Sequence, residues 1–217
     1  MRIYIIFTIA AVMAFSSCNS FSEDIGEIEN KILELSIAGR NNQAIDEYKK
    51  LFTLTNKHNL KLLHRITLGS LEDENGFMKM GGAIAAGQLG NTEALPSLRI
   101  NLRDKDMWVR VWTAVSMGEV GDKQAVPELL RLLKDRIDFV RIAAIVSLGK
   151  LGDASIIPDI AQSLKDKNPN VRQMAAIALG RIGDKSAIPY LEKILIEDKD
   201  MWARLAAVAS LEKLLGK

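Results

Sequence analysis

The stretch from Glu119 to Asp135, EVGDKQAVPELLRLLKD, ends one apolar helical pattern at Gly121 and starts another after Asp122. Glycine takes the left-handed conformation that closes many helices, and aspartate caps helix N-termini by accepting a backbone N–H bond. Pro127 suits the first turn of the second helix, where a missing N–H costs little. The stretch therefore predicts a corner between two helices.

The landmarks of this corner recur along the chain at a spacing of 31 residues. The repeating positions are Gly90, Gly121, Gly152 and Gly183, Gly87, Gly118, Gly149 and Gly180, and Pro96, Pro127, Pro158 and Pro189. Such self-similarity is typical of solenoid proteins, whose units bury their apolar faces against neighbouring units. One hairpin alone cannot bury the apolar stripe of the second helix, which in the quoted unit comprises Ala125, Val126, Leu129 and Leu133. We therefore expect an all-α, right-handed α-solenoid of stacked helix pairs.

The repeated pattern V-R-x(7)-G-x-x-G-D-x(4)-V-P-x-L resembles the HEAT repeat, in the short form named after phycobilisome lyases. It covers residues 77–217, and the final helix carries Glu212 where Gly180 stands one unit earlier, as expected of a cap. Residues 24–76 lack the glycine and proline columns, so we expect a degenerate N-terminal helical cap there. The resemblance implies a fold but no single function, because the family includes scaffolds, adaptors, lyase subunits, hydroxylases and DNA glycosylases.

The N-terminus has the pattern of a signal peptide over residues 1–17, with one basic residue, an apolar run and then small residues. The four residues that end at Cys18, Phe-Ser-Ser-Cys, resemble a bacterial lipobox, although its first position is normally leucine. The resemblance implies that Cys18 is lipidated and that residues 18–23 form a short tether to a membrane. An ordinary secretory signal with an incidental cysteine is the alternative.

The residue after Cys18 is Asn19. In families that sort such lipoproteins, an aspartate at this position usually retains the protein in the inner membrane. The resemblance therefore implies an exported lipoprotein of the outer membrane, facing the periplasm or the cell surface. Because the chain has one cysteine, a disulfide within the mature domain is excluded.

The formal charge is only +2, from 29 basic and 27 acidic residues that are mixed along the chain. A nucleic-acid-binding protein usually carries a broad basic surface, so we expect no nucleic-acid partner. The two histidines, His58 and His64, are six residues apart, which is not the spacing of zinc ligands on a helix. The paired His-Glu dipeptides of HEAT-type hydroxylases are also missing, so we expect no metal, no cofactor and no catalytic residues.

Two charged columns mark the passage from one unit to the next. The columns are Asp104, Asp135 and Asp166, each six residues before Arg110, Arg141 and Arg172. Asp198 and Arg204 continue them after a one-residue insertion. Arginine forks suit bidentate contact with carboxylates, so we expect a structural ladder that fixes the rotation between units. A row of anion-binding arginines is the alternative.

Variable residues lie between the fixed apolar positions of the second helices, which line the concave face in the solenoids that this chain resembles. We expect partner contacts from Glu128, Asp159, Tyr190, Arg131, Gln162, Lys193 and Ile194. A mixed-charge surface of this kind suits a peptide or helix better than a small metabolite. Purely solvated positions are the alternative, since single exposed apolar residues are normal.

An aromatic column occupies the start of the first helices, at Phe77, Trp108, Phe139 and Trp202, with Asn170 in register. It is expected to seal the seams between units, or else to offer a stacking platform for a sugar or peptide. We therefore expect a membrane-anchored, non-catalytic scaffold or adaptor that binds a protein or peptide. The alternatives are a module that binds glycan or peptidoglycan fragments and, after it, a non-catalytic subunit or lyase-like enzyme.

Overall fold

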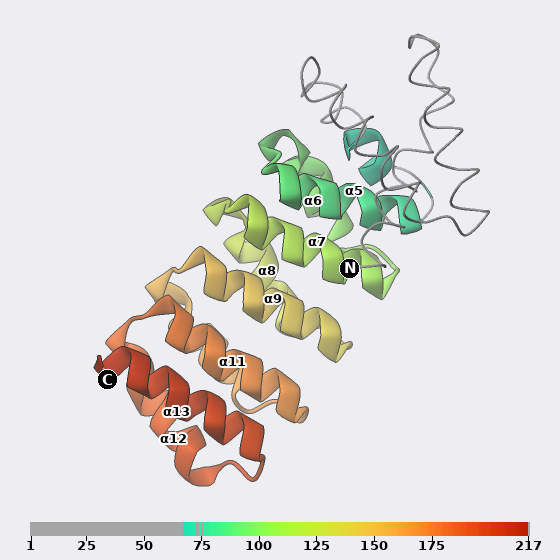
Figure 1. Cartoon of the computed structure of the whole chain (residues 1–217). Coiled ribbons are helices and arrows are strands. Elements are labelled where there is room, and N and C mark those ends of the chain that lie inside the picture. The colour runs from blue at the N-terminus through green and yellow to red at the C-terminus, as the bar shows by residue number, and fades with distance from the viewer. Residues whose placement is uncertain (1–66, 73, 75, 217) are drawn as a thin grey trace, which may run out of the picture. The chain divides into compact units, whose positions relative to one another are not determined.

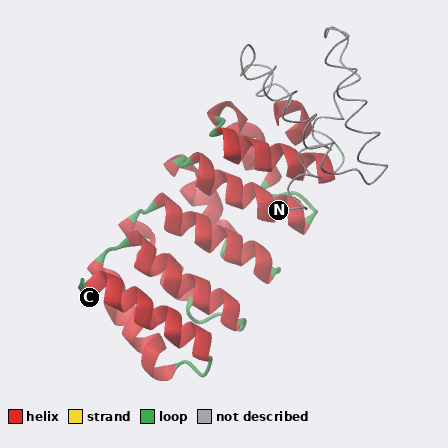
Figure 2. Cartoon of the chain, in the orientation of Figure 1, coloured by secondary structure: helices red, strands yellow, loops and turns green. Residues whose placement is uncertain are grey.

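The computed structural model describes residues 67–72, 74 and 76–216, and its regular elements in these ranges are all helical (Figure 2). The predicted signal peptide, Cys18, the tether, both histidines and most of the predicted N-terminal cap lie outside the described residues. None of the described helices is both long enough and apolar enough to cross a lipid bilayer.

The chain forms two compact units, residues 1–98 and 99–217. In the described part of the first unit, a helix over residues 67–72 precedes α5 (Gly76–Leu89), η1 (Thr92–Ala94) and the start of α6 (Leu95–Asn101). Ser97 on α6 donates a hydrogen bond of 3.2 Å to the Glu72 carboxylate. Gly82 on α5 approaches the backbone of the preceding helix so closely that a Cβ would lie 2.9 Å from the Leu71 nitrogen.

The second unit alternates long and short helices (Figure 1). The long first helices are α7 (Met107–Val120), α9 (Asp138–Leu151), α11 (Pro169–Ile182) and α13 (Met201–Leu215). The shorter second helices are α8 (Val126–Leu132), α10 (Ile157–Ser163) and α12 (Ile188–Glu197). A single 3₁₀ turn precedes each second helix: η2 (Lys123–Ala125), η3 (Ala154–Ile156) and η4 (Lys185–Ala187).

The corner in the quoted stretch differs in one detail from the prediction. Gly121 has a positive φ of 79° and closes α7, as its missing Cβ allows. Asp122 is an N-cap, but it caps the 3₁₀ turn by accepting the Gln124 N–H at 2.9 Å, and the second α-helix begins only at Val126. The predicted start of that helix near Asp122 was therefore too early.

The first helices form a layer in which each helix packs directly on the next, α7 on α9, α9 on α11 and α11 on α13. Glycine makes the approach possible: a Cβ on Gly118 would lie 2.7 Å from the Ser147 Cβ and 2.8 Å from its Cα. The Ser147 hydroxyl donates to the Ala114 carbonyl at 2.7 Å across the same seam. Small residues thus replace a layer of larger side chains between the helices.

The second helices pack mainly on first helices: α8 on α9, α10 on α11 and α12 on α13. Leu129, Ile160 and Leu191 are fully buried in these contacts. Ile194 is only 8% exposed, and the residues at the same repeat position in the other units are also buried: Asn101, Leu132 and Ser163. Its prediction as a surface contact was wrong, because a residue three positions after Leu191 lies on the same helix face as that core leucine.

Candidate functional site

The predicted ladder residues connect successive units. Nε and Nη2 of Arg110 donate to the two carboxylate oxygens of Asp135 at 2.9 and 3.1 Å, and Arg141 holds Asp166 in the same way at 2.7 and 2.9 Å. The Nη1 group of Arg110 donates instead to the backbone carbonyl of Asp104 at 2.8 Å. Each guanidinium therefore binds the backbone of its own loop and the carboxylate of the next loop.

The third rung follows the same geometry despite the one-residue insertion. Arg172 donates to both Asp198 oxygens at 2.6 and 2.8 Å and to the Asp166 carbonyl at 2.9 Å. Asp198 also accepts the backbone N–H of Asp200 at 2.9 Å. These three hydrogen-bonded pairs satisfy the arginine forks bidentately, the strongest geometry for a guanidinium and a carboxylate.

The environment of the rungs shifts the acidity of their carboxyl groups. The hydrogen bond from Arg172 is the largest influence on Asp198 and lowers its pKa. Burial acts to raise the pKa values of Asp135 and Asp166, but hydrogen bonds from their arginines and from backbone N–H groups outweigh it, so both pKa values are lowered. The carboxylates are therefore held in their charged form, as their role in the ladder requires.

The ladder is open at α13. Arg204 donates to the Asp198 carbonyl at 3.1 Å, as the earlier arginines do to their own loops. No carboxylate lies within ion-pair distance of Arg204 among residues 76–216. Within the described residues, its guanidinium keeps the backbone contact and has no counterpart of the carboxylates that the earlier arginines bind.

The predicted partner residues other than Ile194 reach the surface of the second helices. Asp159, Tyr190, Arg131, Gln162 and Lys193 are exposed. Glu128 is half-buried, and its Oε2 atom has no hydrogen-bond partner in the described part of the chain. Five of the seven predicted contacts are thus exposed, Glu128 is half-buried, and Ile194 is buried.

A pocket of about 370 Å³ lies between α10 and α12 and brings together two of these residues, Tyr190 and Lys193. Ala161, Leu164 and Ile194 supply apolar surface to its lining. The pocket exists because the second helices pack on first helices rather than closely on one another. Ile194 therefore takes part as apolar lining rather than as an exposed contact.

Charged residues border the same pocket. Lys165, Lys199 and Glu197 line it together with the rung formed by Arg172 and Asp198. The Oε2 atom of Glu197 lies 3.8 Å from the Nζ atom of Lys193, one helical turn away. Lys165 and Lys199 are exposed. Sequence reasoning missed Lys165 and Lys199, because they lie beyond the second-helix positions that it compared. Each of these lysines stands next to a ladder aspartate in the sequence, and this was the signal that could have identified them.

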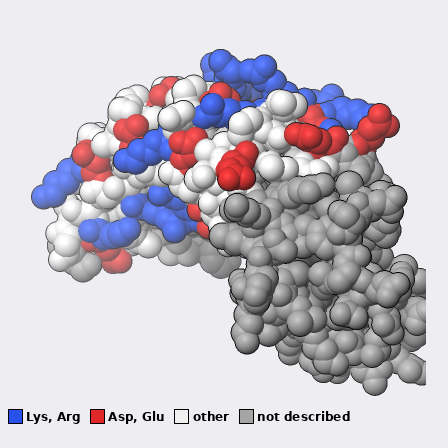
Figure 3. Space-filling view, turned by 90° about the horizontal axis from the view of Figure 1, so that it is seen from above, with Lys and Arg blue, Asp and Glu red and all other residues white. Residues whose placement is uncertain are grey.

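The lining of the pocket carries both signs of charge. Figure 3 shows basic and acidic side chains interleaved over one face of the described residues, with groups of Lys and Arg along its upper edge. No group of three or more His, Cys, Asp and Glu side chains suited to hold a metal ion occurs in the described ranges. The residues that line the pocket can bind a ligand through salt bridges, hydrogen bonds and apolar contact.

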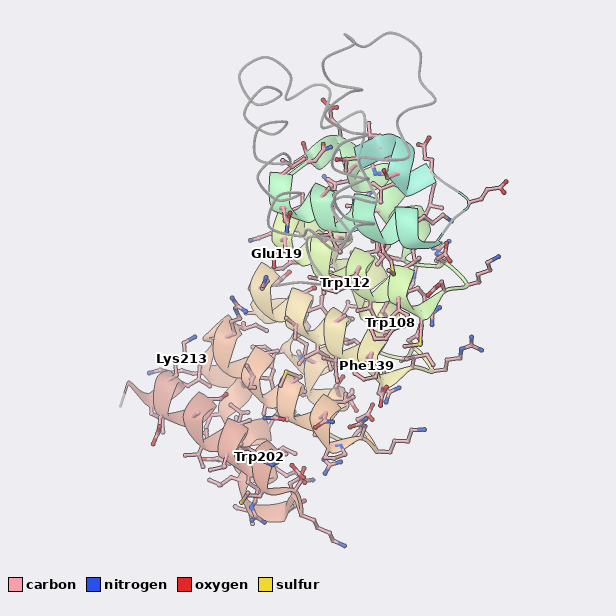
Figure 4. All side chains as sticks on the ribbon, turned by 45° about the vertical axis from the view of Figure 1, so that its right-hand side comes forward. Trp108, Trp112, Glu119, Phe139, Trp202 and Lys213 are labelled. Atoms are coloured by element: carbon pink, nitrogen blue, oxygen red, sulfur yellow. The ribbon has the colours of Figure 1, made fainter. Side chains whose placement is uncertain are left out.

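The aromatic column lies on the first-helix layer, away from this pocket. Trp108 and Phe139 are in tilted contact with ring centroids 5.8 Å apart, and both are about half-exposed. Trp202 is 59% exposed near the N-terminal end of α13 (Figure 4). In the sequence, Asn170 occupies the column position between Phe139 and Trp202. The aromatic contact therefore bridges one seam, between α7 and α9, and the column is interrupted at α11.

Comparison with known proteins identifies the architecture. A family model described as HEAT repeats matches residues 67–148 and 140–212. No curated protein sequence matches the chain. Among solved structures, the complex of CpcE and CpcF of phycocyanin lyase from Nostoc sp. PCC7120 is similar, with a TM-score of 0.62 and 23% identity. The similarity covers 71% of this chain and 65% of that one.

The Escherichia coli protein YibA is also similar, with a TM-score of 0.61 and 18% identity over 97% of this chain and 82% of that one. At these identities the two likenesses establish the fold alone. This chain spans slightly less than two thirds of the length of the phycocyanin lyase protein. The family model, by contrast, spans most of the described residues, and the chain belongs to the HEAT-repeat family.

Proposed function

We propose that the chain is a non-catalytic protein-binding scaffold, tethered to a membrane, that receives its partner on the second helices of residues 99–217. The pocket between α10 and α12, with Tyr190 at its lining, is the observation that carries this proposal. The surface residues of the second helices differ from one repeat to the next at this place. Asp159 on α10 occupies the same repeat position as Tyr190 on α12. Repeat proteins commonly bind through such extended surfaces on a regular frame.

The lining of the pocket defines the chemistry of the segment that would fit. Leu164, Ile194 and the ring of Tyr190 offer apolar contact, while Lys165 and Lys199 are exposed cations without an ion-pair partner among the described residues. A peptide that places an apolar side chain next to a carboxylate would match both parts. Buried aromatic anchors and charge-assisted bonds are the contacts that dominate protein interfaces.

The membrane tether in this proposal rests on the sequence. The apolar run that ends before Cys18 and the resemblance to a lipobox support lipidation of that cysteine. Two acyl chains are enough for stable anchoring. The solenoid would then hold a partner close to the bilayer, at the outer membrane if Asn19 directs sorting as in the families that it resembles.

Site-specific photo-crosslinking in cells tests the proposal. A photoreactive residue replaces Tyr190, and the matched control replaces Ile177, which is similarly exposed at 42% but lies on first helix α11. We expect one protein to crosslink from position 190 and not from position 177. Charge reversals Asp159→Lys and Lys193→Glu should each weaken that crosslink, because both side chains are exposed on the same layer.

Equal capture from both positions, or capture unaffected by both reversals, would contradict a docking role for the second helices. Binding of purified full-length chain to cell-wall fragments, lost on Trp108→Ala without unfolding, would favour the glycan-binding alternative instead. A separate measurement tests whether Cys18 is lipidated. Metabolic labelling with a palmitate analogue should label the wild-type chain and should not label the Cys18→Ser variant.

A further inference from the structure

The loops that join one unit of residues 99–217 to the next carry cations directly beside the ladder aspartates. These cations are Arg103, Lys105, Lys134, Arg136, Lys165, Lys167 and Lys199. All of their side chains are exposed, and none forms an ion pair with a residue in the range 76–216. The ladder bonds hold successive loops side by side, so the cations form one row, which we call the basic edge.

Acidic side chains at the same edge leave much of this positive charge uncompensated. Asp106, Asp138 and Asp200 are half-buried, and each accepts a backbone N–H bond at the start of a first helix, at 2.7, 2.9 and 2.9 Å. Three ladder carboxylates are bound by arginines, and that of Asp104 accepts the backbone N–H of Asp106. Glu197 is exposed, but its carboxylate lies 3.8 Å from a lysine one helical turn earlier. The basic side chains therefore extend into solvent beyond carboxylates that already have partners.

Exposed aromatic residues accompany the basic edge. Trp108, Phe139 and Trp202 each stand three residues after one of its cations, in the first turn of α7, α9 and α13. They are 45%, 53% and 59% exposed and lie at the same end of their helices (Figure 4). Asn170 is exposed at the same position of α11. Because α9 and α11 have first helices on both sides, exposure at this position belongs to every unit and not to the last helix alone.

We propose that the basic edge lies on the surface of a membrane that contains anionic lipids. Its lysines and arginines lie among the headgroup phosphates, and the three aromatic residues reach the boundary with the acyl chains. An anionic leaflet attracts each nearby lysine or arginine. Tryptophan is enriched at the interface, because its ring is apolar while its N–H is polar. Protein segments that lie in the interface combine these two kinds of side chain.

The proposal rests on the membrane location proposed above, and that location favours a lipid surface over a nucleic acid. Single-stranded nucleic acids also bind to rows of cations with aromatic side chains, but an exported chain does not meet them as its regular partner. Contact through the basic edge would orient the solenoid. The N-terminal ends of the first helices would face the bilayer, and the corners at Gly121, Gly152 and Gly183 would face away from it.

Vesicle flotation of the full chain tests the proposal, in a Cys18→Ser background so that no acyl chain contributes. We expect stronger binding to phosphatidylcholine vesicles that contain phosphatidylglycerol than to those without it, and a preference that weakens with added salt. Lys105→Glu with Lys167→Glu should lower the affinity for the anionic vesicles by at least about thirtyfold, since two attractive charges become repulsive. Neither lysine lines the pocket between α10 and α12, so failure of this test leaves the partner site untouched.

The matched control is Lys123→Glu with Lys185→Glu, which changes the net charge equally but at the exposed 3₁₀ turns η2 and η4. It should bind the anionic vesicles as the unaltered background does. The apolar run before position 18 is common to all variants, so it contributes equally to each. Equal binding to both kinds of vesicle, or an equal loss in both double variants, would overturn the proposal. Binding of a single-stranded DNA oligonucleotide without binding of anionic vesicles would assign the edge to a nucleic acid instead.

A second measurement follows the aromatic residues. Lipids with brominated acyl chains quench tryptophans that reach the bilayer, and the chain has three tryptophans. We expect Trp108→Phe with Trp202→Phe to remove most of the quenching in anionic vesicles. Trp112→Phe should preserve it, because Trp112 is half-buried and lies one turn further along α7. Quenching that survives the double replacement would contradict contact between the basic edge and the bilayer.

Discussion

The two helix layers of residues 99–217 are built on different principles. First helices are held at a close separation by glycine seams and by arginines that reach from unit to unit. Second helices pack mainly on first helices, so they leave a pocket between α10 and α12 and present residues that differ from unit to unit. In this fold, the layer that holds the units together is distinct from the layer that is free to vary.

The largest effect should come from breaking a rung of the ladder. Arg141→Ala removes the guanidinium that binds the Asp166 carboxylate. The Asp166 side chain is only 14% exposed, so water replaces that contact poorly. We expect the free energy of unfolding to fall by about 2–4 kcal/mol, somewhat less than for a fully buried pair. Urea denaturation measures the loss. Arg204→Ala is the matched control, and an equal loss there would show that the carboxylate contact contributes little.

The glycine seam should give the next largest effect. An alanine at position 118 places its Cβ against the backbone of Ser147, and the resulting shift outweighs the gain in helix propensity of about 1 kcal/mol. We expect Gly118→Ala to destabilise the chain by about 1–3 kcal/mol. Gln162→Ala, at an exposed position of α10, should change stability by less than about 0.5 kcal/mol. A stabilised Gly118→Ala variant would disprove the tight seam.

Acid should weaken the same layer. The pKa values of Asp135, Asp166 and Asp198 are lowered in the folded state from their ordinary value of 3.8. A lowered folded pKa contributes stability above the unfolded pKa, and this contribution is lost as the pH falls through the folded value. Urea midpoints measured from pH 7 to 3 should therefore decline most steeply below about pH 4. Asp166→Asn should flatten that decline, and an unchanged slope would exclude this group as a cause.

The smallest effects on stability belong to the second layer. Lys193 is exposed, and its contact with Glu197 is a surface pair within one helix. Such pairs contribute about 0.3–0.5 kcal/mol. Lys193→Ala should therefore shift the thermal midpoint only slightly, while it weakens the crosslink from position 190. A large loss of stability would mean that α12 shares the structural role of the first helices.

Periodicity made the repeat architecture and the ladder columns predictable, because packing between identical neighbours imposes the same residue types at each unit. Periodicity could not show which aspartate each arginine binds, because one aspartate stands at a regular interval before the arginine and another at a regular interval after it. Arg110 takes the carboxylate of Asp135, 25 residues ahead, while Asp104, six residues behind, supplies its carbonyl.

Two further features required coordinates. An aspartate caps a 3₁₀ turn and an α-helix with the same side-chain bond, so Asp122 alone could not locate the start of α8. Ile194 was assigned to the surface because its column varies in residue type, including Asn101 and Ser163, yet all of these are buried. The pocket arises from the spacing between α10 and α12, which periodicity does not report.

Each ladder arginine binds two neighbouring loops, and this has a mechanical consequence. Because Arg110, Arg141 and Arg172 each hold the backbone of one loop and the carboxylate of the next, tension on one unit passes directly to its neighbour. A chain under tension should therefore release whole repeats, each when its rung breaks, rather than single helices.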